Sequence, residues 1–564
     1  MKKYAMAAAL ALMIAPVMQY ALFFGLHPEG LVFNSLGEDE ALFITAIKLS
    51  EFGYESPWTL ESDGVVRLAF LNPANGPVFM LFPLSVIYAA SGISALGLFA
   101  LFKLFSAALM LASIYLLVRH FDFKCRHRIF ILLALSAGFG GLIHLISSFF
   151  YPERLLYPQS LFGFGVSIFR FVESYQAFSL ALGTLSMLFF VKKRVLLSSL
   201  LLGLTVLVYP FHGVSFFMVM AVYCRVFSLG ASQLSKVFAS LLLFSSVWAF
   251  SYIFQPALFD NYANAVGTVS VNVLPSVLLG LGPLFIFLLY DMKKRFPFVS
   301  GKRHLAFFVA SFALMSYYQI SSSVWAPPLP SHPLFIVFNI PFLAFLGYLA
   351  KRVLESGHEK RIVFMYAWFI VFLFVVMFPV KLFSVLPPKV TVFLYFPLAF
   401  LAHEGMKNFK HAGLFVAVVA VSALSIFFFY SFEQMDARNI YKNGALGEQN
   451  FFYAESDMKA LGFLKGMPAG NVMSSQAIGT YLPYYSGKKS LLFGTSRGDI
   501  VLDVGEKLSD YRKFYSSPSR DILEKYGIRY VFYGTFEKRL GDLGSPDYLR
   551  KVYGDGAEIY EFTP

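Results

Sequence analysis

Three consecutive carboxylates are the residues whose type and spacing could most directly do chemistry. Glu38, Asp39 and Glu40 lie within residues 37–43, shortly after a hydrophobic stretch ends. Crowding like charges costs folding free energy unless a cation or water compensates. It also raises the pKa of a carboxylate, which makes that carboxylate a better proton acceptor. The cluster is therefore a candidate general base. The alternative is a solvated loop, or the acidic first turn of a helix stabilised by the helix dipole.

The composition places these carboxylates in a membrane protein. The 564 residues are 57% hydrophobic and 18% aromatic, and only 14% are charged, which excludes the soluble globular classes. The net charge of +13 does not indicate nucleic-acid binding, because 29 Lys and Arg but only 16 Asp and Glu precede residue 431, whereas 17 of each kind follow. The excess belongs to the hydrophobic part, where basic loops set orientation. We expect a polytopic helical protein in contact with lipids and no nucleic-acid partner.

The hydrophobic segments predict about 13 transmembrane helices. The first runs from the amino terminus to about residue 24 and is long enough to be an uncleaved span rather than a signal peptide. The apolar stretch 78–92 is short for a span and is predicted to lie as a helix in the outer interface. The remaining spans are predicted near 97–118, 129–150, 177–191, 195–211, 213–226, 237–254, 273–290, 304–321, 333–350, 361–380, 391–405 and 412–430.

The basic residues predict the orientation of these spans. The amino terminus and the predicted inner loops carry 22 Lys and Arg, whereas the predicted outer loops carry six. This asymmetry indicates a cytoplasmic amino terminus. We expect the plasma membrane of a prokaryote, because the sequence shows no sorting signal. Most acidic residues of the hydrophobic part then lie outside, which indicates an acidic outer vestibule. Cys125 and Cys224 fall near the cytoplasmic side and are interpreted as structural.

Two domains are predicted from the change in composition. Residues 1–430 form the transmembrane domain, with a long first outer loop at 26–96 that contains the acidic cluster. Residues 431–564 form a small extracytoplasmic α/β domain with one core. Its helices are predicted near 455–466, 500–514 and 518–526, and its strands near 471–474, 529–533, 550–553 and 557–562. It shows no spacing of a nucleophile and a base, so we expect it to cover the vestibule or to select an acceptor.

Further charged residues in the outer loops could converge with the acidic cluster on one cavity. A carboxylate base with cations suffices to transfer a group from a phosphate-activated donor, because the cations stabilise the charge that grows on the leaving phosphate. The alternatives are lysines that snorkel to the interface and arginines that anchor headgroups. The candidates are the acids Glu153 and Glu173 and the cations Arg154, Arg170, Lys381 and Lys389. Glu404, by contrast, is interpreted as an interface or packing residue.

The order of these features resembles the GT-C superfamily of integral membrane glycosyltransferases, which use polyprenyl-phosphate-linked sugars. Aminoarabinose transferases, protein mannosyltransferases and oligosaccharyltransferases belong to this group. Residues 37–43 are similar to the acidic Asp-Glu-x-x-Tyr-like motif of the family's first outer loop, with Phe43 in place of the usual Tyr. The segments 460–464, 481–488, 523–532 and 549–553 resemble the small outer domain of prokaryotic members.

The resemblance implies roles for several residues. Asp39 aligns with the family's catalytic carboxylate and Glu40 with the acid beside it, so Asp39 would activate the acceptor for an inverting displacement. Glu153 or Glu173 would match the second acidic position, and Lys389 best matches the cation that contacts the carrier phosphate. Some members bind a divalent cation and others do not. If magnesium or manganese is bound here, Asp39 and Glu153 would be its ligands.

We therefore expect a glycosyltransferase that moves a sugar from a lipid-linked donor to a glycan, lipid or protein acceptor at the outer face of the membrane. One alternative is a transporter or flippase for lipid-linked sugars. Such folds often show internal repeats and buried midplane charges, of which this sequence has few, Lys103 being the main exception. The other alternative is a non-catalytic membrane scaffold with an outer binding domain.

Overall fold

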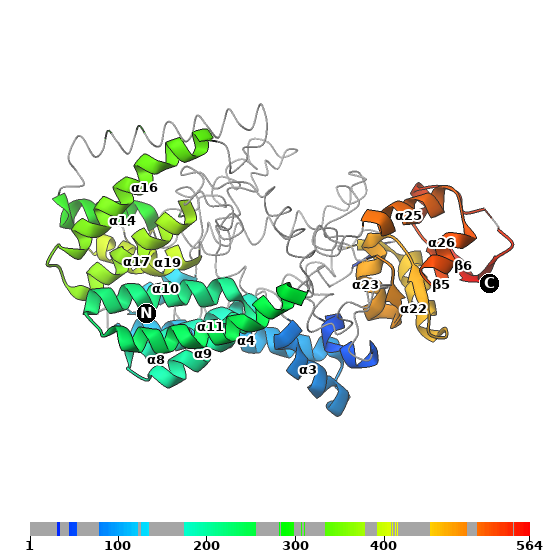
Figure 1. The fold of residues 1–564 in the computed structure, drawn as a ribbon, viewed down its shortest axis with the longest axis horizontal. Helices are drawn as coiled ribbons and strands as arrows, with labels where there is room; N and C mark the ends of the chain where they lie inside the picture. The colour runs from blue at the N-terminus through cyan, green and yellow to red at the C-terminus, as the bar shows by residue number, and fades with distance from the viewer. Residues whose placement is uncertain are drawn as a thin grey trace. The chain divides into compact units, whose positions relative to one another are not determined.

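A computed structural model gives the fold (Figure 1). It describes residues 31–33, 44–52, 78–121, 126–134, 174–254, 281, 284–297, 306, 310, 333–377, 392–407, 409, 412, 414–415, 452–492, 505–544 and 546–563. The chain divides into two compact units. The first comprises residues 1–16, 103–246 and 263–431, and the second comprises residues 17–102, 247–262 and 432–564. One border thus falls at the composition change, but the first loop groups with the carboxyl-terminal part. The division into domains 1–430 and 431–564 stays a prediction.

Helices among the described residues overlap ten of the predicted spans; eight of them have 14–26 residues, and the other two have only nine and 12. Uninterrupted apolar runs form helices in lipid because a helix satisfies all its backbone hydrogen bonds internally. They are α4 (Ala95–His120), α5 (Arg126–Ala134), α8 (Ser174–Val191), α9 (Val195–Val208), α10 (Pro210–Phe227), α11 (Ala231–Phe254), α14 (Leu284–Arg295), α16 (Pro333–Leu354), α17 (Lys360–Met377) and α19 (Val392–Met406).

Two of the helices within the described residues, α4 and α10, are long and apolar enough to cross a membrane by length and composition. Several others are apolar but shorter, among them α9 and α19. The predicted count of about 13 spans is therefore not confirmed and stays a prediction.

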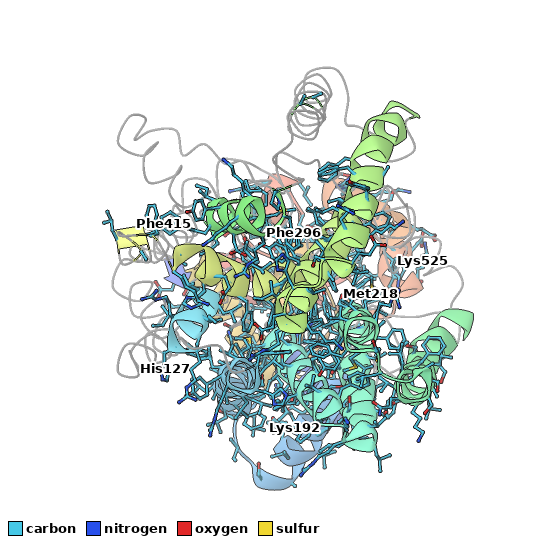
Figure 2. All side chains as sticks on the ribbon, turned by 90° about the vertical axis from the view of Figure 1, so that its left-hand side faces the viewer. His127, Lys192, Met218, Phe296, Phe415 and Lys525 are labelled. Carbon is cyan, nitrogen blue, oxygen red and sulfur yellow. The ribbon has the colours of Figure 1, made fainter. Side chains whose placement is uncertain are left out.

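Small residues let the helices of the first unit approach closely. A Cβ on Gly183 of α8 would lie 2.0 Å from the ring of Phe216 in α10. The Phe216 ring therefore occupies the space that any larger residue at position 183 would fill with its side chain. Ser186 of α8 and Ser198 of α9 exchange hydrogen bonds, each hydroxyl donating to the other's carbonyl oxygen at 2.7 and 2.9 Å. Close packing and interhelical hydrogen bonds are what associates helices in lipid. Figure 2 draws the described side chains as sticks and labels Lys192, which lies in the turn after α8.

Helix α19 is buried along its whole length and is held at its end by a network of charges. All 15 of its residues are buried. Glu404 accepts hydrogen bonds from Arg295 at 3.1 Å and from Lys407 at 2.5 and 2.6 Å. Arg295 also donates to Asp291 at 2.8 and 3.0 Å, and the Tyr366 hydroxyl donates to Asp291 at 2.7 Å. Each buried carboxylate needs partners to offset its lost hydration. Since these partners come from different helices, the network joins α14, α17 and α19.

The carboxyl-terminal part of the second unit has the predicted α/β class. A sheet in the order β4-β3-β5-β7-β6 carries β3 parallel to both β4 and β5, and β7 antiparallel to both β5 and β6. The predicted helices and strands are present. The sequence analysis did not predict α23 or β4. The elements are α22 (Glu455–Gly466), β3 (Asn471–Met473), α23 (Gln476–Ser486), β4 (Lys489–Ser490), α25 (Gly505–Ser516), α26 (Arg520–Lys525), β5 (Ile528–Tyr533), the 3-10 helix η7 (Glu537–Arg539), β6 (Leu549–Asp555) and β7 (Ala557–Phe562).

Strand β5 is central to this sheet and its core. Val531 and Tyr533, two residues apart in the strand, lie on the same face of the sheet. They pack in a cluster with residues of α25 and α26. From α25, the fully buried Tyr515 donates hydrogen bonds to the carbonyl oxygens of Phe532 at 2.6 Å and Met473 at 3.2 Å. One side chain thereby ties β5 to β3 at their carboxyl ends.

The first loop contributes three described elements to the same unit. Strand β1 (Leu31–Phe33) pairs antiparallel with β2 (Phe452–Ala454). Residues 44–47 are helical and lead into the 3-10 helix η1 (Leu49–Phe52). Helix α3 (Val78–Ser91) covers the stretch predicted to lie in the outer interface. The helix itself is confirmed, whereas its position relative to the membrane stays a prediction.

Candidate functional site

Every site residue predicted from the sequence lies outside the residues that the structure describes. The structure therefore neither brings these residues together nor separates them, and their roles stay predictions. They are the catalytic candidates Asp39 and Glu40, the second acids Glu153 and Glu173, and the cations Arg154, Arg170, Lys381 and Lys389. The two candidate metal ligands, Asp39 and Glu153, are among them.

The chain on either side of the acidic cluster is described, and on both sides it contacts the carboxyl-terminal part. On the amino-terminal side, the β1–β2 ladder pairs Leu31 with Ala454, Val32 with Tyr453 and Phe33 with Phe452. The ladder joins residues more than 400 positions apart in the sequence. The loop that carries the acidic cluster thus begins at a strand that is paired with the start of the carboxyl-terminal domain.

On the carboxyl-terminal side, the chain enters a buried helical turn. Ile44, Ala46 and Ile47 are at most 2% exposed, and Thr45 is fully buried. The Thr45 hydroxyl is without a hydrogen-bond partner among the described residues. The burial of four consecutive residues fixes this turn against its neighbours, since each apolar side chain removed from water contributes to stability.

Lys48 connects this turn to α23. Its Nζ donates a hydrogen bond to the carbonyl oxygen of Tyr484 at 3.3 Å and lies 5.8 Å from the centroid of that residue's ring. It also forms an ion pair with Glu51 at 2.9 Å. The Lys48 side chain is only 14% exposed, so the cation–π and charge interactions are partly shielded from water and gain strength.

Glu51 in turn connects the loop to α3, which is not counted among the spans. The Tyr88 hydroxyl donates a short hydrogen bond to Glu51. This hydrogen bond, with a smaller effect from burial, raises the pKa of Tyr88 to about 12. Tyr88 therefore stays a protonated donor near neutral pH. Lys48, Glu51, Tyr88 and Tyr484 form one chain of contacts, which we call the loop anchor.

A second group of polar residues lies at the carboxyl ends of β3 and β5. The fully buried Glu537 accepts hydrogen bonds from the backbone amides of Ser475 at 2.6 Å and Gly534 at 3.1 Å. Asp457 accepts from the amide of Thr535 at 3.1 Å. Burial raises the pKa of Glu537 to about 7 and also raises that of Asp457. We call Glu537 and Asp457 the acid pair.

The acid pair occupies the sheet edge where α/β folds usually bind ligands, namely the carboxyl ends of parallel strands. Here the amides at that edge are already satisfied by the protein's own carboxylates. Ser475 is also the N-cap of α23, its hydroxyl accepting from the amide of Ile478 at 3.3 Å. Glu537 of the acid pair thus joins the chain that follows β3 to the chain that follows β5. The sequence analysis missed it, and the only available signal was the capping serine after an apolar strand.

The described residues contain no group of three or more His, Cys, Asp or Glu side chains that could hold a metal ion. The candidate ligands Asp39 and Glu153 lie outside those residues.

Comparisons with known proteins give weak similarities. No family model matches the chain, and no curated protein matches it. Among solved structures, it is similar to the Archaeoglobus fulgidus oligosaccharyltransferase in the apo form, with 13% identity, a TM-score of 0.42, and coverage of 98% of this chain and 73% of that chain. It is also similar to the archaeal oligosaccharyltransferase AglB from Archaeoglobus fulgidus in complex with an inhibitory peptide and a dolichol-phosphate, with 13% identity, a TM-score of 0.41, and coverage of 94% and 69%. With TM-scores below 0.5, these similarities carry no weight for the function of this chain.

Proposed function

We propose that this protein is a membrane glycosyltransferase that moves a sugar from a polyprenyl-phosphate-linked donor to an acceptor at the outer face of the plasma membrane. The observation that carries the proposal is the grouping of the loop bearing Glu38, Asp39 and Glu40 with the carboxyl-terminal α/β domain in one compact unit. Both flanks of the acidic cluster contact that domain, through β1 and through Lys48. A loop held at both ends is suited to carry a catalytic group, because catalysis needs the reacting groups prepositioned.

In the proposed reaction, Asp39 takes the proton from an acceptor hydroxyl or amine. The acceptor atom attacks the anomeric carbon of the sugar from the face opposite the phosphate. A bond from the acceptor to the anomeric carbon forms as the bond from that carbon to the phosphate oxygen breaks, and the configuration inverts. The leaving phosphate gains negative charge, which Lys389 stabilises.

The donor phosphate of a lipid-linked sugar lies at the level of the headgroups, where Lys and Arg residues at the ends of loops also lie. Lys381, Arg154 and Arg170 are therefore proposed as further phosphate contacts, and Glu153 or Glu173 as the second acid.

The test measures donor consumption by purified full-length protein in nanodiscs with a panel of polyprenyl-phosphate sugars and candidate acceptors. The Asp39→Asn variant removes the base with minimal change in size. We expect donor turnover to fall by about 100-fold or more, the scale expected for losing a general base. Asp521→Asn, on the exposed surface of α26, is the matched control and should turn over donor like the wild type.

Thermal unfolding of each variant separates loss of chemistry from loss of folding. A collapse in turnover with an unchanged melting temperature would support both the activity and its base. If the wild type binds donors but consumes none with any acceptor, the enzymatic proposal fails and a transporter or scaffold becomes the better explanation. If Asp39→Asn turns over normally, the assignment of the base fails.

A further inference from the structure

The loop anchor has no part in the chemistry proposed above, yet two of its residues, Lys48 and Glu51, follow the acidic cluster closely in the sequence. Asp39 is six residues after Phe33 in β1 and five residues before Ile44. Six residues of fully extended chain reach at most about 20 Å. The placement of the acidic cluster is therefore coupled to the two flanking segments by short lengths of chain.

Each flanking segment is held by the carboxyl-terminal domain through a different kind of contact. The first contact is a backbone ladder between β1 and β2, which depends little on side-chain identity. The second is a single side chain, Lys48, with its Nζ on the carbonyl oxygen and ring of Tyr484. Lys48 is also the residue through which the turn at 44–47 reaches Glu51 and, beyond it, Tyr88 of α3.

The sheet fixes the site on which Lys48 rests. Tyr484 lies in α23, whose N-cap Ser475 is two residues after the end of β3 and whose C-cap Gly487 has a left-handed backbone. A Cβ on Gly479 of the same helix would lie 2.2 Å from the carbonyl oxygen of Leu492, so α23 packs closely on the chain that follows β4. A tightly packed helix presents a fixed carbonyl to the lysine.

We infer that the carboxyl-terminal domain positions the acidic loop from both of its ends, and that Lys48 is a positioning residue for the proposed transfer reaction. This inference deepens the proposed function and rests on it for its catalytic consequence. The contacts themselves do not depend on that function. The domain thus acts on the acidic cluster without supplying a catalytic group.

The contact between β1 and β2 is tested by cysteine cross-linking in full-length protein in membranes. Val32 and Tyr453 are directly opposite in the ladder, and opposite residues in antiparallel strands have Cα atoms about 4.5–5.5 Å apart, within disulfide range. The Val32→Cys/Tyr453→Cys pair should form a disulfide under mild oxidation. The matched control, Leu31→Cys/Phe452→Cys, places the cysteines at opposite ends of the ladder and should not. Mass spectrometry of the linked peptides identifies the bond.

The role of Lys48 is tested by steady-state kinetics. Lys48→Met keeps an unbranched side chain as far as Cε and removes Nζ with its charge and hydrogen bond. Misplacing a reacting group by about 1 Å can cost about 100-fold in rate. We expect kcat to fall by about 10- to 100-fold with the KM for the donor changed by less than about twofold. Lys48→Arg should recover most of kcat. Lys459→Met, on the exposed face of α22 in the same unit, is the matched control.

The outcomes separate this inference from the proposed function. If the in-register cysteines cross-link no faster than the control pair, the domain does not hold the loop and the inference is overturned. If they cross-link but Lys48→Met behaves like Lys459→Met, the positioning role of Lys48 is overturned. If the wild type consumes no donor, the proposed function fails while the cross-link still decides the contact. An unchanged melting temperature in Lys48→Met excludes unfolding as the cause of lost turnover.

Discussion

At the scale of single residues, Glu537 shows how burial and hydrogen bonding compete over one carboxyl group. Two backbone amides stabilise its charged form, at 2.6 and 3.1 Å, whereas complete burial favours its neutral form. Burial has the larger effect, and the pKa is raised to about 7. The neighbouring Asp457 acts in the same direction because a second negative charge would be repelled.

The raised pKa predicts how stability depends on pH. Since the folded state holds the proton of Glu537 more tightly than the unfolded state, its stabilising contribution is complete below pH ~4.5 and is lost as the pH rises through about 7. The free energy of unfolding of the wild type, relative to Glu537→Gln, should therefore fall between about pH 5 and pH 8, by an amount on the order of 3 kcal/mol.

Hydrogen exchange in peptides from β3 and β5, compared between the two proteins at matched pH, measures this difference. Comparison at matched pH cancels the contributions of all other titrating groups, because the wild type and Glu537→Gln share them. Glu524→Gln, which alters an exposed pair with Arg520, is the control and should show no such trend. A wild type that gains stability over Glu537→Gln with rising pH would mean that the two amides outweigh burial.

At the scale of elements, the charge network at the end of α19 predicts a large effect for one substitution. Glu404 and Asp291 have side chains only 6% and 4% exposed. Glu404→Gln leaves Lys407, whose side chain is 44% exposed, without its countercharge, while Arg295, 27% exposed, keeps Asp291 as a partner. Because the carboxylate is buried and its cation partners are partly exposed, we expect a cost between that of an exposed pair, less than about 1 kcal/mol, and that of a buried pair, about 3 kcal/mol. The melting temperature of the purified protein in detergent should fall accordingly.

The control for this prediction is an ion pair of the same type on the surface. Glu359→Gln alters the pair with Arg361, whose side chains are 55% and 41% exposed, and such pairs contribute less than about 1 kcal/mol. Equal melting temperatures for Glu404→Gln and Glu359→Gln would show that water reaches the network and that it does not hold α14 to α19.

The elements also show what the sequence could and could not predict. Helices such as α4 and α17 followed from apolar runs, because hydrophobicity over 18 or more residues is a local property. The short strand β4 and helix α23, which contains Pro483, have no comparable local signal. Glu404 was interpreted as a packing residue, but its partner Arg295 lies 109 residues away. No local pattern reveals such a pairing.

At the scale of the whole molecule, charge balance and hydrophobicity change near residue 431 and predict a border between the transmembrane and carboxyl-terminal domains there. The first loop is predicted to belong to the membrane domain, since it lies between two hydrophobic stretches. The structure groups that loop with the carboxyl-terminal domain. The contacts responsible, β1 with β2 and Lys48 with Tyr484 436 residues away, pair backbone groups or single side chains and leave no periodic trace in the sequence. The predicted catalytic residues lie outside the described residues, so the sequence remains their only basis.

The proposed function requires the carboxyl-terminal domain and the acidic loop to face outward, and this topology can be tested on the whole molecule. The basis is the count of 22 Lys and Arg in the predicted inner segments against six in the outer ones, an asymmetry that sets orientation because basic loops are retained in the cytoplasm. Single cysteines at two exposed positions report the two sides. Lys459 lies in α22 of the carboxyl-terminal domain, and Lys192 lies in the turn between α8 and α9.

In a background lacking Cys125 and the buried Cys224, we expect Lys459→Cys to react with a membrane-impermeant maleimide on intact cells. Lys192→Cys should react only after the membrane is opened, since residues 192–194 form one of the turns that the basic residues predict to lie inside. The reverse pattern would place the acidic loop in the cytoplasm, because that loop and α22 share one compact unit. The donor would then have to be consumed at the inner leaflet, and an outward-facing transferase would be excluded, whatever the fate of Asp39→Asn.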